Sequence, residues 1–373
     1  MVSKKDLQEL GRRYKAQKNN IGHIYGYFIN EEGNLVAEFD ESLANMALDE
    51  QDKFLALLKK AFSGNIGQTI LPIRFENEYM LSDARYKLLT DLRDCALSDK
   101  KLRDTLKDEI VCACCMSGNY LILMAAESYD IRRRGEDDDE LSDSGEVHRY
   151  FVVSVCPVTD DKAKLIYSHM GKRFQDSGIR QLAGNPVLGL MFPAFDERSS
   201  DVGEIITMHG AKADYEGFID GILGCERPKD AFEQKAAFVE ALRSTVGEDL
   251  GYEHIAAATQ AISNHVKLMQ ESGEEGDSVS VEELGMLMER ELNVSSDDFV
   301  ETMEDELDKV ESIPTANLCD MKAMTVKAPG IQVKVSRELQ NLVKVDADKS
   351  GNGKCLIIRL PDDVEIDGIS ITN

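Results

Sequence analysis

The chain has 373 residues, of which 42% are hydrophobic and 30% are charged, and its formal net charge is −26. This composition is typical of a globular protein of about two or three domains whose core is stable without disulfides or metals. A surface with this negative charge repels nucleic acid and anionic lipid. Only a local basic patch could bind either of them. The first ten residues precede no apolar run of the secretory type, and no apolar stretch approaches the ~20 residues that span a bilayer. Without a secretory signal or a membrane span, we expect a cytoplasmic protein without a membrane partner. The eight cysteines form no spaced framework of the disulfide type, so we expect them to be reduced thiols.

In chain order, the N-terminal part alternates between helical and strand-like patterns. Apolar residues recur at helical spacing near residues 3–14, 54–64, 82–95, 98–116 and 215–224. Strand patterns occupy residues 24–39 (a hairpin), 69–75, 120–126, 150–158, 187–192 and 204–208. Pro72 lacks a backbone N–H and therefore directs its strand toward an edge. The whole pattern predicts a mixed sheet with flanking helices.

The residues between the two longest apolar strands, 131–147, are mostly charged or small and polar. They begin with Arg132, Arg133 and Arg134 and continue with an acidic run and a stretch of Ser, Asp and Gly. A tight hairpin turn is shorter and less charged than this connection. We therefore predict either a disordered segment or a protruding functional loop at 131–147.

From residue 226 onward the pattern becomes helical and acidic. Phe232, Ala236 and Val239 share one helical face, and Ser280 with Glu283 matches a capping box at a later helix start. Short strand patterns return after Pro314. The sequence thus predicts an α+β fold in three parts, namely an α+β domain at 1–225, an acidic helical segment at 226–312 and a small β-rich C-terminal unit at 313–373.

Signatures of metal and cofactor binding are incomplete along the chain. Cys112 and Cys115 form one closely spaced pair, whereas a tetrahedral zinc ion takes four ligands. The acidic turn that starts at Asp346 imitates a calcium loop, but Ile357 stands where the twelfth-position glutamate belongs. Neither a phosphate-binding glycine loop nor a GxSxG, HExxH or GxGxxG motif occurs. We expect no cofactor and no metal, and the motifs favour a protein that is not an enzyme.

One group of residues would nevertheless suit catalysis. It consists of Asp196, Glu197, Arg198 and Asp201, which follow an apolar strand. Carboxylates directly after a buried strand lie at the rim of a sheet, where α/β proteins often bind ligands. A neighbouring arginine would keep such a carboxylate ionised. The alternative is a solvated turn in which an aspartate caps the next element.

The N-terminal helix is the one basic feature of this acidic chain. Its candidate phosphate-binding residues are Lys4, Lys5, Arg12, Arg13, Lys15 and Lys18. Clustered cations on one face of a helix can contact a nucleic-acid backbone. The alternative is a solvated face that pairs with the acidic remainder of the protein.

Several stretches carry a family resemblance. They read SGNYLIL at 117–123, VSVCPV at 153–158, GLMFPAF at 189–195, ILGC at 222–225 and DVEIDGI at 363–369. With these segments the chain resembles a bacterial family known as a domain of unknown function (number four-three-one-seven) over nearly its whole length. The resemblance implies no assigned chemistry, so it transfers no functional residue. In layout alone, the chain is also similar to the nucleoid-associated protein family.

These observations lead to one main hypothesis and two rivals. The main hypothesis is a non-enzymatic intracellular interaction or regulatory protein that binds a protein partner or self-associates. The first rival is a nucleoid-associated protein that binds nucleic acid through the basic N-terminal helix. The second is an enzyme with an acidic site near Asp196.

Overall fold

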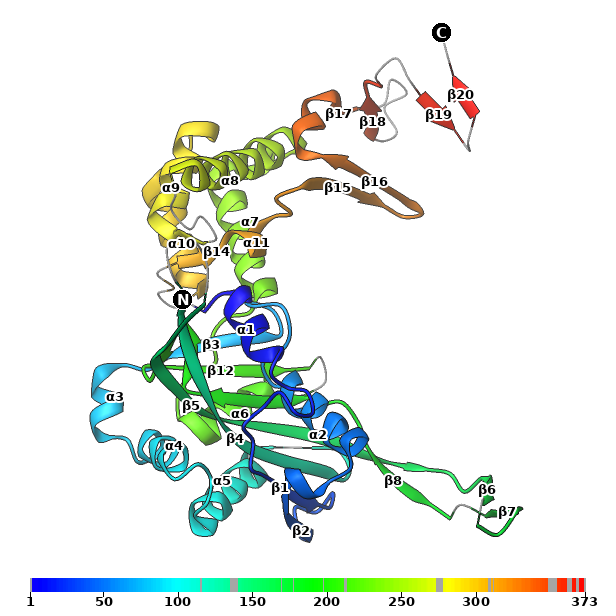
Figure 1. Cartoon of the computed structure of the whole chain (residues 1–373). Coiled ribbons are helices and arrows are strands. Elements are labelled where there is room, and N and C mark those ends of the chain that lie inside the picture. The colour runs from blue at the N-terminus through cyan, green and yellow to red at the C-terminus, as the bar shows by residue number, and fades with distance from the viewer. Residues whose placement is uncertain are drawn as a thin grey trace. The chain divides into compact units, whose positions relative to one another are not determined.

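The computed structural model places the chain in two compact units, Met1–Pro228 and Lys229–Asn373. Figure 1 shows the helices and strands of both units with the labels used below. The structure describes residues 2–114, 116–134, 140–168, 170–176, 178–196, 198–210, 213–272, 278–307, 310, 312–347, 354–360, 364–366 and 369–371.

The first unit is built on one large sheet. Its strands are β1 (His23–Ile29), β2 (Leu35–Ser42), β3 (Ile70–Arg74), β4 (Tyr120–Arg134), β5 (Glu140–Asp161), β9 (Leu188–Phe192) and β12 (Glu204–His209). They lie in the order β2-β1-β4-β5-β9-β12-β3, and β8 (Arg180–Ala183) pairs with the far end of β5. The predicted α+β class is confirmed. The strand pairings of this sheet are antiparallel in the described residues.

Helices cover both faces of this sheet (Figure 1). One face packs on α4 (Ala84–Asp94), α5 (Lys100–Ala113) and α6 (Tyr215–Leu223), and the other on α1 (Lys4–Gly11) and α2 (Leu48–Lys60). The shorter helices are α3 (Asn77–Ser82) and a 3-10 turn at Leu43–Asn45. Along β4, Ile122 and Met124 join the first core, while Leu123 and Ala125 join the second, because successive strand residues point to opposite faces. Burial on both faces explains why the central strands are apolar at nearly every position.

The two edges of the sheet are blunted in different ways. Pro72 lies on β3, the last strand in the order, where its missing N–H costs no ladder bond on the open side. The expectation of an edge strand around Pro72 is confirmed. At the other edge, β2 is mostly exposed and carries Glu38, Asp40 and Glu41, charges that discourage pairing with another strand.

The prediction of a loop at 131–147 is wrong for most of this segment. β4 and β5 stay paired through it, with Ile131 opposite Glu146 and Arg134 opposite Glu140. An antiparallel ladder gains its backbone hydrogen bonds whether or not its side chains are apolar, so a polar stretch can continue a strand beyond the core. Residues 135–139 lie outside the described residues.

Beyond the sheet, β5 continues into an extension formed by residues 158–183, here called the arm. Its strands are β6 (Leu165–Ser168), which pairs with β7 (Arg173–Asp176), and β8, which pairs with the end of β5. None of the buried residues in the described core clusters comes from the arm. After β9, a small hairpin of β10 (Ala194–Asp196) and β11 (Ser199–Asp201) leads into β12.

The second unit has a helical core. Its helices are α7 (Ala231–Val246), α8 (Tyr252–Ser272), α9 (Val281–Leu292), α10 (Ser296–Leu307) and α11 (Thr315–Leu318), with 3-10 turns at Gly247–Asp249 and Arg337–Leu342. The predicted capping box at the start of α9 is confirmed, with Ser280 and Glu283 bonded reciprocally. The strand pairs are β13 (Ser278–Ser280) with β14 (Ser312–Pro314), β15 (Ala323–Ala328) with β16 (Ile331–Ser336), β17 (Val343–Ala347) with β18 (Lys354–Ile358), and β19 (Val364–Ile366) with β20 (Ile369–Ile371).

A close approach between α2 and β9 generates a test of this architecture. A Cβ at Gly189 would lie 2.7 Å from the Cβ of Ala61 and 2.9 Å from the carbonyl oxygen of Val153. We predict that Gly189→Ala lowers the free energy of unfolding by about 1–3 kcal/mol, because either the helix or the strand must move. Urea denaturation measures the loss. Gly22→Ala, with open space around its added methyl, is the control, and equal midpoints for both variants would contradict the packing.

Candidate functional site

The acidic residues predicted near the sheet rim come together only in part. Oxygen atoms of Asp196, Asp201 and Glu204 lie within 4.8 Å of one another. Arg198 faces elsewhere, because its guanidinium donates to Glu9 at 2.7 Å. Glu197 lies outside the described residues. Two of the four predicted residues therefore share a site with a third carboxylate, here called the carboxylate cluster.

Glu204 was missed as a site residue because it begins a strand pattern. Its signal in the sequence is a carboxylate immediately before the apolar run of β12. The residue is 4% exposed, and within the described part of the chain its Oε2 atom has no hydrogen-bond partner. Burial raises the pKa of the Glu204 carboxyl above its usual range, and the nearby Arg74 opposes this shift.

The arginine at the cluster comes from a neighbouring strand. Arg74 on β3 donates to Oδ2 of Asp201 at 2.7 Å, and the backbone N–H of Gly203 donates to Oδ1 of the same residue at 2.9 Å. These two contacts orient the Asp201 carboxylate. The expectation that an arginine accompanies the rim carboxylates thus applies to Arg74, which no short-range pattern around residues 196–201 could reveal.

The basic N-terminal stretch is divided between surface and interior. The helix α1 ends at Gly11, so the later cations lie beyond it. The exposed residues are Lys4, Lys5, Arg12, Lys15 and Lys18. Arg13 is different, because its Nε and a terminal nitrogen contact Oε1 of Glu127 at 2.8 and 2.7 Å. An arginine engaged in this way is not available to a phosphate.

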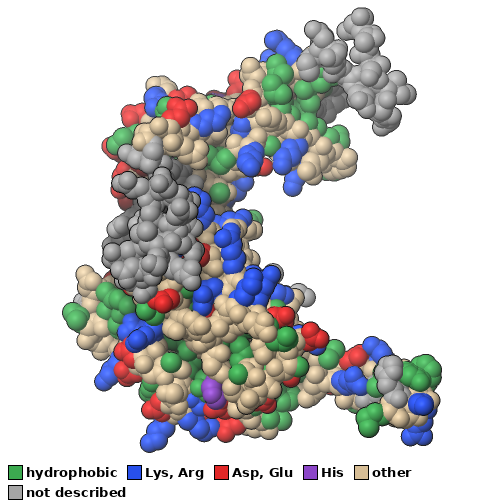
Figure 2. All heavy atoms as spheres, viewed as in Figure 1, with side chains coloured by type: hydrophobic (Ala, Val, Ile, Leu, Met, Phe, Trp, Pro, Cys, Tyr) green, Lys and Arg blue, Asp and Glu red, His purple; other side chains and the backbone are tan. Residues whose placement is uncertain are grey.

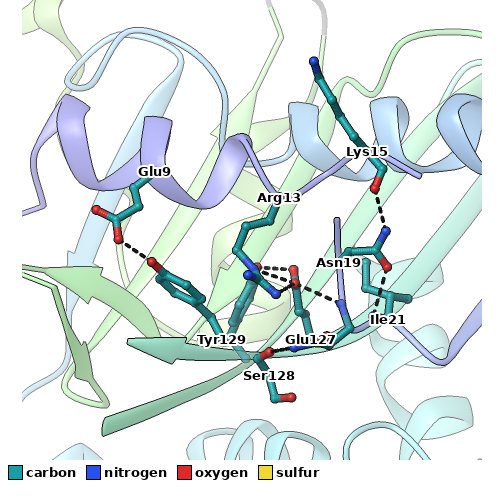
Figure 3. Close-up of polar contacts among 10 residues, drawn as sticks. Glu9, Arg13, Lys15, Asn19, Ile21, Glu127, Ser128 and Tyr129 are labelled. Carbon is teal, nitrogen blue, oxygen red and sulfur yellow. Dashed lines mark hydrogen bonds and ion pairs between the residues drawn. The ribbon is translucent and has the colours of Figure 1, made fainter. Parts of the chain in front are cut away.

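Figure 3 shows Arg13 directed from the end of α1 toward Glu127, beside Tyr129. The Arg13 guanidinium lies 4.6 Å from the centre of the Tyr129 ring, and the Tyr129 hydroxyl donates to Glu9 at 2.5 Å. Glu127 is 4% exposed and also accepts from the hydroxyl of Tyr150 at 2.7 Å. This network fixes the N-terminal segment to β4 and β5, so its role is structural.

A surface that the sequence analysis missed lies on the arm. Its exposed apolar side chains are Leu165 (73%), Tyr167 (47%), Met170 (99%), Phe174 (68%), Ile179 (73%) and Leu182 (49%). The arm also carries five basic and three acidic side chains, in contrast to the charge of −26 for the chain. Figure 2 shows hydrophobic and basic side chains next to each other on this extension. The signal in the sequence was a set of apolar residues interleaved with lysine and arginine.

Free thiols are found at Cys95, Cys112, Cys156, Cys225, Cys319 and Cys355. Cys112 is exposed and Cys114 is buried, while Cys115 lies outside the described residues. Burial raises the pKa of Cys156 to about 12, so this thiol stays protonated at neutral pH.

Fold and surfaces together define an α+β protein with a two-sided antiparallel sheet, a rim of three carboxylates and an exposed arm. The chain belongs to the family described as a domain of unknown function (DUF4317), whose model matches residues 2–369. The resemblance seen in the sequence motifs is therefore confirmed. A comparison with the curated proteins found no match. Within the described ranges, none of the helices has both the length and the hydropathy needed to cross a bilayer.

The Arg13 network predicts a large difference between two adjacent arginines. We expect Arg13→Ala to lower the free energy of unfolding by about 3 kcal/mol, because it leaves the buried Glu127 carboxylate without its cation. Arg12→Ala is the matched control, since Arg12 is exposed. Chemical denaturation of both variants measures the difference. A comparable loss in the control would contradict the structural role of Arg13.

A buried histidine predicts how stability depends on pH. His148 is fully buried, its Nδ1 lies 2.9 Å from Oγ of Ser200, and its ring stacks on Tyr150. Burial lowers the pKa of His148 to about 3, whereas an exposed histidine in the unfolded chain titrates near pH 6.5. Between these two values the unfolded state binds one more proton than the folded state, so acid favours unfolding.

We therefore predict that His148 contributes a loss of about 1.4 kcal/mol in stability per pH unit as the pH falls from 6.5 toward 3. In His148→Asn this contribution disappears, and the slope of stability against pH becomes shallower by that amount. Urea denaturation at several pH values gives the slope of unfolding free energy against pH for the wild type and for His148→Asn. The substitution also costs packing energy, but this cost is the same at every pH and does not change the slope. Identical slopes would show that His148 is not buried in its neutral form.

Proposed function

We propose that this protein is a non-enzymatic cytoplasmic interaction protein that self-associates through the arm. The observation that carries the proposal is the group of six large, exposed apolar side chains on residues 165–182. Two of them, Tyr167 and Phe174, lie opposite each other on the β6–β7 pair, and apolar side chains exposed next to each other are typical of interaction sites. The free thiols agree with a reducing compartment.

Burial of the apolar side chains of the arm can supply enough free energy for association. Burying one large apolar side chain contributes about 1.5–3 kcal/mol, so several together can exceed the entropy that two chains lose on association. Tyr167 and Phe174 already form an edge-to-face pair, with ring centroids 5.5 Å apart. A paired aromatic surface of this kind loses little additional freedom on binding.

Charge favours a second copy of the chain as the partner. The arm is basic, with five basic and three acidic side chains, whereas the whole chain carries a net charge of −26. An arm therefore repels another arm and attracts the acidic body of another copy. In a twofold dimer each arm would contact the body of its partner, so the attraction would occur twice.

The strand edges of the arm provide a second attachment. Within the described residues, β6 and β7 pair only with each other. The edge of a strand pair is a template to which a further strand can add.

This proposal predicts a dimer that depends on the arm. The full chain is expected to show a concentration-dependent mass of two copies by light scattering after size-exclusion chromatography. Charges introduced by Phe174→Asp together with Ile179→Asp should shift it to a monomer, since the buried apolar contact is lost. High salt should weaken the wild-type dimer because part of the attraction is between charges.

Leu81→Asp is the matched control, because Leu81 is 89% exposed on α3 but is not part of the arm. This variant should remain dimeric. Circular dichroism should show folded protein for all variants, because the arm contributes nothing to the described core clusters. A wild-type monomer at every concentration, or a dimer that the arm charges leave unchanged, would overturn the proposal.

A further inference from the structure

The carboxylate cluster is built by three successive segments of the chain. Asp196 ends β10, Asp201 ends β11 and Glu204 begins β12. In the β10–β11 hairpin, Asp201 is opposite Ala194, and residues two apart on a strand point to the same side, so Asp196 and Asp201 share a face. Glu204 joins them from the first position of the next strand, and the three oxygen atoms lie within 4.8 Å of one another.

Three carboxylates lie close together in this cluster. Arg74 donates to Asp201, and its side chain is 60% exposed, so solvent screens the positive charge that it brings. Solvent thus weakens the attraction between Arg74 and the three carboxylates. Like charges at this separation repel one another, and the repulsion is relieved by a proton or by a bound cation.

Glu204 is the observation that points to a ligand. The residue is 4% exposed, its carboxylate faces the other two, and Oε2 has no hydrogen-bond partner among the described residues. A buried carboxylate oxygen without a partner is unfavourable by itself, and native structures usually satisfy such groups. Buried Glu127 in the same unit shows the usual solution, because it accepts from Arg13 and Tyr150.

We propose that Asp196, Asp201 and Glu204 bind one divalent cation of the class that prefers oxygen ligands. Carboxylates without histidine or cysteine suit Ca²⁺, Mg²⁺ or Mn²⁺ rather than zinc. The three oxygen atoms lie within 4.8 Å of one another, which is close enough for one ion to contact all of them. Ca²⁺ accepts irregular coordination, whereas Mg²⁺ demands near-ideal octahedral geometry and loses its water reluctantly, so three protein carboxylates favour Ca²⁺, with water completing the coordination.

Arg74 is compatible with this cation. Arg74 donates a hydrogen bond to Oδ2 of Asp201. Because a carboxylate oxygen has two lone pairs, the same carboxylate can accept from arginine and ligate a metal. In this arrangement Arg74 orients a ligand and limits the excess negative charge of the cation-free site. The bound cation would tie the β10–β11 hairpin to the start of β12 and so stabilise this rim of the sheet.

Calorimetric titration of the chelator-treated full chain with Ca²⁺, Mg²⁺ and Mn²⁺, each alone, tests the inference. Wild-type protein is expected to bind one ion per chain with Ca²⁺ preferred, and the ion should raise the midpoint of thermal unfolding. Glu204→Gln and Asp196→Asn should each weaken cation binding by about tenfold or more. Mutating residues that only hydrogen-bond the ligands of a metal site already causes a loss of this size. Glu50→Gln removes one exposed carboxylate on α2 and should leave affinity unchanged.

Folding of the variants separates loss of the site from loss of structure. Because Glu204→Gln removes a buried charge and the repulsion within the cluster, this variant should be at least as stable as the wild type without cations. It should also lose the rise in melting temperature on adding Ca²⁺. Absence of binding by the wild type to all three ions would overturn the proposal, and so would unchanged affinity in Glu204→Gln and Asp196→Asn. Neither readout depends on the arm.

Discussion

The antiparallel pairing of β4 with β5 is the constraint on which the first unit depends. β4 holds β1 on its outer side, and β5 holds β9, so the register of this one hairpin positions both wings of the sheet. The same pairing sends alternate side chains into two cores and therefore determines where helices can cover the sheet. One strand of the pair also continues into the arm. A shift of one residue in this ladder would reverse both faces at once.

Two buried glutamates in this unit show how the same residue type serves different ends. Glu127 is surrounded by donors, and it holds the N-terminal segment against β4 and β5. Glu204 lies beside two further carboxylates, with an oxygen that no donor in the described chain contacts. Since a protein gains nothing from an unsatisfied buried charge, the second arrangement is the one that indicates a ligand. The comparison depends on hydrogen-bond partners and not on burial, which is the same for both residues.

The arm shows how little an average charge says about a local surface. A net charge of −26 describes the chain as a whole, yet residues 158–183 are basic and apolar. In the proposed self-association, this local exception would be attracted to the acidic surface of a second copy, because unlike patches on identical chains attract. The proposed interaction role and the proposed cation site are independent, since they use different residues and different physical forces.

The sequence by itself determined the features that depend on near neighbours. The Ser280–Glu283 capping box and the edge position of the Pro72 strand follow from residues a few positions apart, and the structure confirms them. The apolar face predicted from Phe232 and Ala236 is wrong, because both residues are exposed on α7 and the buried face carries Phe238 instead. The family, too, could be identified from short motifs. The α+β class followed from the alternation of the two periodicities.

Only the tertiary structure decided which distant side chains meet. Arg12 and Arg13 look alike in sequence, and the difference between them is Glu127, more than a hundred residues away. Arg74 likewise reaches Asp201 across the sheet, and the polar residues after Ile131 remain in a strand because a partner strand is present. Periodicity records which face a residue occupies, but sheet register over long separations determines its neighbours, and no local pattern encodes that register.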